Sequence, residues 1–278
     1  MIAIGQHHDL EILRETSVGL YLGDQNDNEI LLPNKYIPEN IEIGANIKVF
    51  VYKDNENRPI ATTLEPKISL NKFASLQVAM VTEYGAFLDW GIEKQLFVPY
   101  REQNMRMKTG NWYLVYMYLD DKTNRLVASS RINRFLDNEE LTVKEGDEVE
   151  VMFWEATDLG INVIINHLHK GLIYYNEFFS QSKKGETRKG YIHKIREHNK
   201  IDVRLQASGY QNISVHAAKI MAQLQENDGF LGLTDKSSPN DISYQLEMSK
   251  KSFKKGLGAL YKQRLIRLEK DGIYLIKS

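Results

Sequence analysis

The chain has 278 residues, 42% of them hydrophobic and 26% charged, which is the composition of an ordinary globular protein rather than a disordered or fibrous one. It contains no cysteine, which excludes disulfides, thiolate metal sites and cysteine nucleophiles and favours a reducing compartment. The formal net charge of −1 hides an asymmetry: residues 1–181 carry 17 Lys and Arg against 27 Asp and Glu, whereas residues 182–278 carry 19 against 10, so the carboxy-terminal third is a candidate to meet a polyanion.

The amino terminus, MIAIGQHHDLEIL, is spaced like a strand. It lacks the basic patch and the long apolar run of a secretory signal. No stretch of the chain approaches about 18 consecutive apolar residues, which excludes a membrane-spanning helix. We therefore expect a cytoplasmic protein with no membrane partner.

The first two thirds of the chain contain an internal repeat. Gly19, Gly85 and Gly160 each precede a β-rich run, in the stretches SVGLYLGD, EYGAFLDWG and DLGINVIIN. Around each glycine, runs with period-2 alternation are separated by Asn/Asp turns, which predicts five short strands per unit. Five strands in about 65 residues favour a small oligonucleotide-binding (OB) barrel. The expected barrels cover residues 1–66, 70–137 and 141–209.

Two loops fit this interpretation. PNKYIPEN (33–40) and PYREQNMRM (99–107) each follow a strand that ends in proline, where an OB barrel connects its third and fourth strands. Small SH3-like barrels remain the alternative. The predicted fold class is mainly β, with three tandem barrels before a mixed α+β module.

That last module occupies residues 212–278, where the hydrophobic period changes from two to 3.6. Ser214 can cap a helix with the apolar face Ala217, Ile220, Met221 and Leu224. Ser238-Pro239 starts a second helix, with Asp241 three residues after the cap. Ser249 starts a third, and Lys270-Asp271-Gly272 turns a hairpin. Three helices and a hairpin predict a winged helix.

The third helix separates apolar from basic residues. One side carries Phe253, Leu257, Leu260 and the stem of Arg264, and the other carries Lys250, Lys251, Lys254, Lys255 and Lys262. The corresponding helix of this fold enters nucleic-acid grooves, so these lysines are candidate phosphate contacts. The face lacks the Arg, Asn and Gln that read base edges, which predicts binding without much sequence choice. A merely solvated face, or a surface that docks proteins, remains open.

The segment EYGAFLDWGIEKQLFVPYR (83–101) resembles the RNA-binding domain repeated in ribosomal protein S-one, strongly in the middle unit and less in the first and third. MSKKSFKKGLGALYKQRLI (248–266) is similar to the characteristic segment of the bacterial conserved virulence factor B family, which the chain resembles over nearly all its length. The resemblance implies three S-one-type barrels followed by a winged helix, and an RNA-binding protein.

By this resemblance, Phe87 and Phe97 form a platform on which unpaired bases stack, with Tyr84 beside them. Nearby cations for the phosphates are Lys94, Arg101 and Arg106. The matching positions are Tyr21 and Leu31 in the first unit and Asn162 and Leu172 in the third, so these units are weaker candidates and can be spacers. The alternative is that Phe87 and Phe97 are buried core residues.

The densest basic stretch, residues 183–204, is expected to join the third barrel to the winged helix. It supplies the candidate phosphate contacts Lys183, Lys184, Arg188 and Lys189. A solvated hairpin is the alternative.

Enzymatic motifs are missing from the sequence. It has no Walker-type glycine loop, no GxSxG, no HExxH and no dinucleotide fingerprint. His167 and His169 would share one strand face without a third metal ligand, and Asp120 and Asp121 fit a hairpin turn. We therefore expect a non-enzymatic protein without cofactor or metal, which binds single-stranded RNA through its barrels and winged helix in the control of gene expression. Two alternatives stay open: an adaptor that docks ribosome- or nuclease-associated proteins, and a DNA-binding regulator that uses the winged helix.

Overall fold

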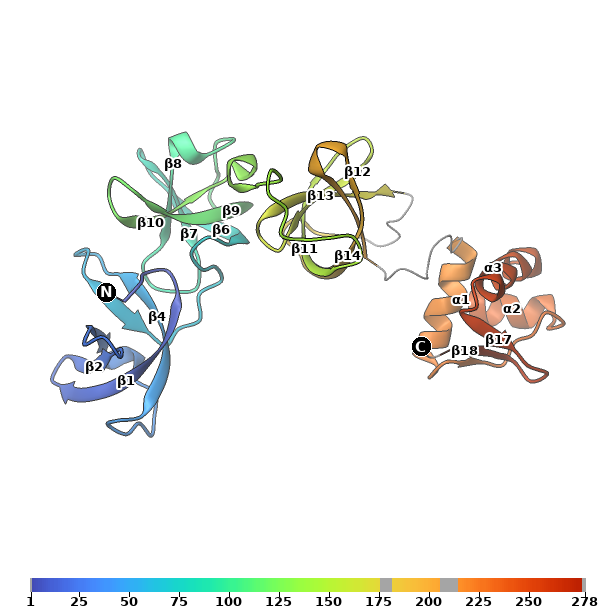
Figure 1. The fold of residues 1–278 in the computed structure, drawn as a ribbon, viewed down its shortest axis with the longest axis horizontal. Helices are drawn as coiled ribbons and strands as arrows, with labels where there is room; N and C mark the ends of the chain where they lie inside the picture. Colours follow the sequence, from blue (N-terminus) through green and yellow to red (C-terminus); the bar gives the residue numbers. More distant parts are fainter. Residues whose placement is uncertain (1, 176–181, 206–214, 277–278) are drawn as a thin grey trace. The chain divides into compact units, whose positions relative to one another are not determined.

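The computed structural model describes residues 2–175, 182–205 and 215–276, and it confirms the predicted fold class (Figure 1). Three closed five-stranded barrels precede a small helical module with a three-stranded sheet. No helix in these residues is long and apolar enough to cross a bilayer.

The first barrel has the strand order β1-β2-β3-β5-β4. Its strands are β1 (His7–Thr16), β2 (Gly19–Gly23), β3 (Glu29–Pro33), β4 (Asn46–Lys53) and β5 (Pro59–Thr62). Antiparallel pairing of β1 with β4 and parallel pairing of β3 with β5 close the barrel. This is the five-stranded closure of an OB fold.

The second barrel repeats this arrangement as β10-β8-β7-β6-β9. Its strands are β6 (Phe73–Val81), β7 (Gly85–Asp89), β8 (Leu96–Pro99), β9 (Trp112–Asp120) and β10 (Arg125–Ser129). Short 3₁₀ helices, Asn34–Tyr36 and Tyr100–Glu102, follow β3 and β8, in the two loops that the sequence places between third and fourth strands.

The third barrel has the order β11-β12-β13-β15-β14. Its strands are β11 (Glu148–Ala156), β12 (Gly160–Ile165), β13 (His169–Tyr174), β14 (Thr187–Arg196) and β15 (Lys200–Arg204). Most of the basic stretch 183–204 therefore lies in two strands of the barrel itself, and its interpretation as a connection to the winged helix is wrong. The expected barrel, 141–209, also includes residues 176–181 and 206–209, which lie outside the described residues.

The repeated glycine has a steric cause. A Cβ on Gly19 would lie 2.1 Å from the carbonyl oxygen of Leu32, and one on Gly85 would lie 2.3 Å from that of Val98, so only glycine lets β2 and β7 approach their neighbours. The hydroxyl of a threonine three residues earlier donates to each glycine carbonyl, at 2.7 Å from Thr16 to Gly19 and 3.4 Å from Thr82 to Gly85. Thr157 donates to the Gly160 carbonyl at 2.9 Å in the third barrel.

The first two barrels share a core, and they belong to one compact unit together with residues 150–171 and 182–188. Phe50 of β4 meets Trp90 edge to face, with ring centroids 5.7 Å apart. Both side chains are buried. The burial of large aromatic surface between the barrels stabilises their contact.

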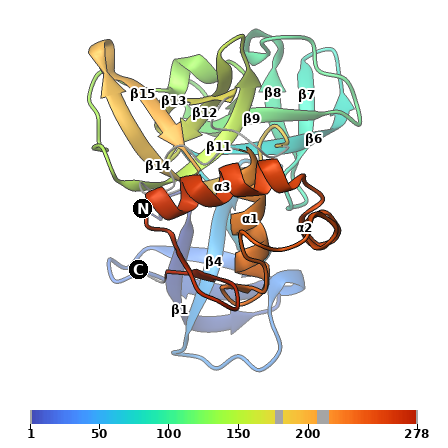
Figure 2. The ribbon, with the colours of Figure 1, turned by 90° about the vertical axis from the view of Figure 1, so that its right-hand side faces the viewer.

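The winged helix comprises α1 (Val215–Glu226), β16 (Phe230–Leu231), α2 (Pro239–Leu246), α3 (Lys250–Lys262), β17 (Ile266–Leu268) and β18 (Ile273–Leu275). Ser238 and Ser249 cap α2 and α3 by accepting the amide hydrogens of Asp241 and Ser252, as predicted. α1 crosses α3 in Figure 2, and Gly256 permits this approach because a Cβ there would lie 2.9 Å from the Ala217 nitrogen.

Two details of this module differ from the expectation. The hairpin is joined by a third strand, β16, which is too short to give a periodic signal. Arg264 is not part of the helical face, because α3 ends at Lys262 and Arg264 adopts a left-handed conformation with φ 57°. Ser214, the expected first cap, lies outside the described residues.

Candidate nucleic-acid interface

Phe87 and Phe97 form a cross-strand pair on neighbouring strands β7 and β8. Their ring centroids are 4.9 Å apart. Both side chains are half-buried, whereas their neighbours Leu88 and Leu96 are buried in the barrel core. The alternative that Phe87 and Phe97 are core residues is therefore wrong, since the pleat turns both rings to the outer face of the sheet.

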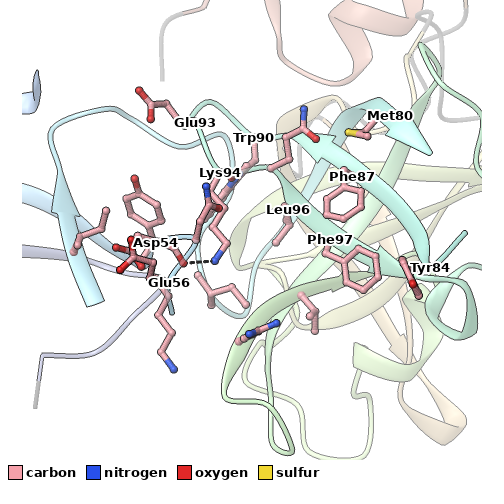
Figure 3. A pocket seen from close by; sticks show the side chains of 18 of the residues that line it. Asp54, Glu56, Met80, Tyr84, Phe87, Trp90, Glu93, Lys94, Leu96 and Phe97 are labelled. Carbon is pink, nitrogen blue, oxygen red and sulfur yellow. Dashed lines mark hydrogen bonds between the residues drawn. The ribbon is translucent and has the colours of Figure 1, made fainter. Parts of the chain in front are cut away.

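The two rings lie in a hollow of about 1100 Å³ that both of the first two barrels line (Figure 3). Tyr84, in the turn before β7, and Met80, near the end of β6, also line it and are 70% and 47% exposed. Exposed aromatic faces beside a hollow are the arrangement that base stacking requires.

Three hairpins also bring cations to the hollow, namely Lys53, Lys94 and Arg125. Lys94 Nζ donates to the Asp54 carbonyl oxygen at 2.6 Å, and this contact is drawn in Figure 3. Lys53 Nζ donates to the Asn124 carbonyl oxygen at 2.6 Å. Burial lowers the pKa of Lys94, and the neighbouring charges of Arg125 and Lys53 lower it further, against an opposing effect of Asp54.

Lys94 lines the same hollow as Phe87 and Phe97, and its contact with phosphates stays a prediction, whereas sequence reasoning missed Lys53 and Arg125. Each flanks a polar turn, in KDNEN and in DKTNR, where charged residues are common. No spacing along the chain indicates that the two turns face the same hollow.

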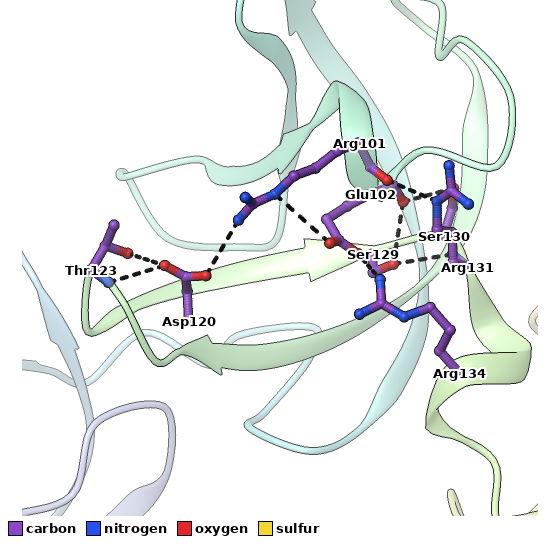
Figure 4. A network of polar contacts seen from close by, with 8 residues as sticks. All are labelled: Arg101, Glu102, Asp120, Thr123, Ser129, Ser130, Arg131 and Arg134. Carbon is purple, nitrogen blue, oxygen red and sulfur yellow. Dashed lines mark hydrogen bonds and ion pairs between the residues drawn. The ribbon is translucent and has the colours of Figure 1, made fainter.

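Arg101 and Arg106 do not line the hollow. Arg101 belongs to a polar network with Asp120, at 3.5 Å, and the buried Glu102, which Arg134 contacts at 2.9 Å (Figure 4). The Arg106 guanidinium lies 3.7 Å from the ring centroid of Tyr100. Both arginines are exposed, and their expected contact with phosphates stays a prediction.

The equivalent positions of the other barrels are poorer in aromatic surface. Tyr21 pairs across strands with Leu31, as Phe87 does with Phe97. Arg14 covers one face of the Tyr21 ring at 4.2 Å and is itself bound to Glu29 at 2.6 Å. Asn162 and Leu172 are half-buried.

The lysines of α3 lie on the side away from its buried stripe of Phe253, Leu257 and Leu260. Lys250 is half-buried, and its Nζ donates to the Lys236 carbonyl oxygen at 3.4 Å. The others are exposed: Lys251, Lys254, Lys255 and Lys262. The predicted division of this helix into an apolar and a basic side is confirmed.

Two of the four candidate basic residues before and within β14 form ion pairs with carboxylates. Lys183 and Lys184 are exposed. Arg188 is paired with Glu186 at 2.7 Å, and Lys189 with Glu148 at 2.9 Å. The Glu148 carboxylate raises the pKa of Lys189 by accepting its hydrogen bond.

His167 and His169 do not share a strand face. His167 lies in the turn before β13 with φ 57°, where its Nδ1 accepts the amide hydrogen of Phe73 at 3.0 Å. His169 is buried and contacts the Asp137 carbonyl oxygen. The two rings therefore contact different backbone groups, and no cluster of potential metal ligands is found among the described residues.

Comparisons with known proteins agree with this architecture. Residues 4–64 match the model of an S1 domain, and residues 218–275 match that of the CvfB-like winged helix domain. The S1 match falls on the first barrel, although the middle barrel carries the stronger motif in the sequence. Both OB barrels and winged helices bind nucleic acids, so the domain composition supports nucleic-acid binding.

Relatives extend over nearly the whole chain. Conserved virulence factor B of Staphylococcus epidermidis is 24% identical over 99% of this chain and 95% of its own. Uncharacterized protein YitL of Bacillus subtilis is 27% identical over 97% and 93%. A crystal structure of a multidomain protein with nucleic acid binding domains from Streptococcus pneumoniae is 22% identical, with a TM-score of 0.40 and 98% of both chains covered. The resemblance read from the sequence is confirmed.

Proposed function

We propose that this chain, similar over nearly its full length to the conserved virulence factor B proteins, is a cytoplasmic, non-enzymatic protein that binds single-stranded RNA and acts in post-transcriptional control. The half-buried, outward-facing pair Phe87 and Phe97 carries the proposal. Every base has a π-face, so two rings that line a hollow accept unpaired bases of any sequence.

The rings favour a single strand over a duplex as the ligand of the middle barrel, and a nearby cation adds a contact for its backbone. Lys94 lies within the same hollow as the rings, so a base and a backbone phosphate can be held together. Bases in a duplex are stacked on each other and do not offer their faces to a protein.

The winged helix supplies a second contact in this proposal. Four exposed lysines on α3 contact the backbone without reading bases. Modules that bind one strand weakly gain affinity together, by about 10²-fold to 10⁴-fold where their sites can be occupied at once. Lys183 and Lys184 are further exposed candidates for contact with phosphates.

The test compares binding of the whole chain to single-stranded RNA, single-stranded DNA and duplex DNA by fluorescence anisotropy at low salt. Preference for single-stranded RNA supports the proposal. Preference for duplex DNA would replace it with a winged-helix regulator, and no binding to any of the three would favour a protein adaptor.

A further inference from the structure

The hollow between the first two barrels contains more positive charge than its acidic residues balance. Its acidic lining residues are Asp54, Glu56 and Glu93. Arg58 binds Asp54 at 2.7 Å and Glu56 at 2.8 Å, and Lys35 binds Glu93. These three carboxylates are therefore paired with two other cations, which leaves one negative charge to set against the remaining cations of the hollow.

Three further cations line the hollow: Lys53, Lys94 and Arg125. In the described part of the chain none of them forms an ion pair with a carboxylate. Instead, neutral oxygens hold them: Lys53 and Lys94 donate to backbone carbonyls at 2.6 Å, and Arg125 Nε donates to Asn57 Oδ1 at 3.3 Å. Such acceptors orient a cation without neutralising it.

Each of these cations is oriented by an oxygen of the other barrel. Lys53 and Asn57, of the first barrel, contact Asn124 and Arg125 of the second, and Lys94 of the second contacts Asp54 of the first. A lysine ammonium has three hydrogens to donate, so one bond to a carbonyl leaves donors for an anion. Three cations that repel one another in a partly desolvated hollow are stabilised when an anion enters.

We propose that Lys53, Lys94 and Arg125 form one phosphate-binding site shared by the first two barrels, which holds a backbone phosphate of the strand whose bases stack on Phe87 and Phe97. This inference rests on the proposed function and adds to it that the first barrel, although poor in aromatic surface, completes the site of the second.

The first test measures the salt dependence of binding to a single-stranded RNA of about 12 nucleotides. Each phosphate contact contributes about −0.7 to the slope of log affinity against log salt for single strands. Lys53→Gln and Arg125→Gln should each flatten the slope by up to about 0.7 relative to the parent. The control is Lys48→Gln, an exposed lysine on the same strand β4 outside the hollow, which should leave the slope unchanged.

A second test separates phosphate from base. An abasic strand of the same length keeps the phosphates and offers nothing to stack. Its binding should weaken on Lys53→Gln and be indifferent to Phe87→Ala. Inorganic pyrophosphate should raise the melting temperature of the parent and have a smaller effect on the Lys53→Gln variant.

The outcomes distinguish the two claims. If the slope of Lys53→Gln and Arg125→Gln equals that of the parent while Phe87→Ala still weakens RNA binding, the shared site is refuted and the proposed function stands. A lower melting temperature with an unchanged slope would assign these cations to holding the barrels together. If the parent binds no RNA, the proposed function fails, and an equal response of parent and variant to pyrophosphate would refute the phosphate site independently.

Discussion

Replacing both platform rings by leucine should weaken binding to single-stranded RNA by about tenfold or more and leave the fold intact. The first barrel shows that leucine is tolerated at such a position, since Leu31 takes the place in β3 that Phe97 takes in β8. Leucine keeps apolar bulk but has no π-face, so Phe87→Leu with Phe97→Leu removes stacking selectively.

The magnitude follows from the geometry of the pair. A base stacked on an aromatic ring is worth about 1–3 kcal/mol, and about 1.4 kcal/mol corresponds to tenfold in affinity. Because the ring centroids are 4.9 Å apart, the two single losses should not add in the double variant. Both rings are only half-buried, so the cost in stability should stay below the roughly 3–5 kcal/mol of a fully buried Phe→Ala change.

The assay is fluorescence anisotropy with labelled single-stranded RNA at fixed low salt, together with thermal unfolding of each variant. Trp112→Leu is the matched control, since Trp112 is a 58% exposed aromatic of the same barrel that does not line the hollow. Parent-like affinity in the folded double variant, or an equal loss in the control, would refute the assignment of the platform.

Three further predictions concern other parts of the chain. Gly256→Ala should lower the melting temperature because its Cβ would lie 2.9 Å from the Ala217 nitrogen, whereas Gly258→Ala, with nothing within 4 Å, should raise it, as helix propensity favours alanine by about 0.5–1 kcal/mol. Burial lowers the pKa of His167, so the contribution of this side chain to stability is present above its unfolded pKa of about 6.5 and is lost as the pH falls through its folded pKa. Asparagine tolerates the φ of 57° at this position, so His167→Asn should make the melting temperature fall less steeply below about pH 6.5. Replacing Lys250, Lys251, Lys254 and Lys255 of α3 by glutamine should flatten the slope of log affinity for RNA against log salt by up to about 3 units. If that slope is unchanged and altering residues 183, 184, 188 and 189 flattens it clearly, the phosphate contacts belong to the third barrel instead.

The barrels and helix starts were predictable because their signals are local. Alternation along a strand, a polar turn and a serine before a helix act within a few residues, and Ser238 and Ser249 cap the helices where the sequence places them. β16 escaped prediction because two residues, Phe230 and Leu231, cannot show a period.

The candidate site was only partly predictable because some of its side chains come together only when the two barrels pack against each other. Phe87 and Phe97 follow from the strand pattern and the resemblance, whereas Lys53 and Arg125 reach the hollow through the packing of two barrels. His167 shows the same limit: a turn with positive φ, which alternation along a strand cannot reveal, directs it to the amide of Phe73.

The shared core of the first two barrels has a practical consequence for dissecting the protein into fragments. The expected boundaries, 1–66 and 70–137, separate the barrels by topology, yet Phe50 and Trp90 lie on opposite sides of that cut and are 0% and 2% exposed in the intact chain. A fragment holding either barrel alone would present a large aromatic face to water and be prone to associate with itself. Loss of RNA binding by such a fragment would then report a damaged surface rather than a missing site, so single substitutions in the whole chain are the sounder route to each barrel's role.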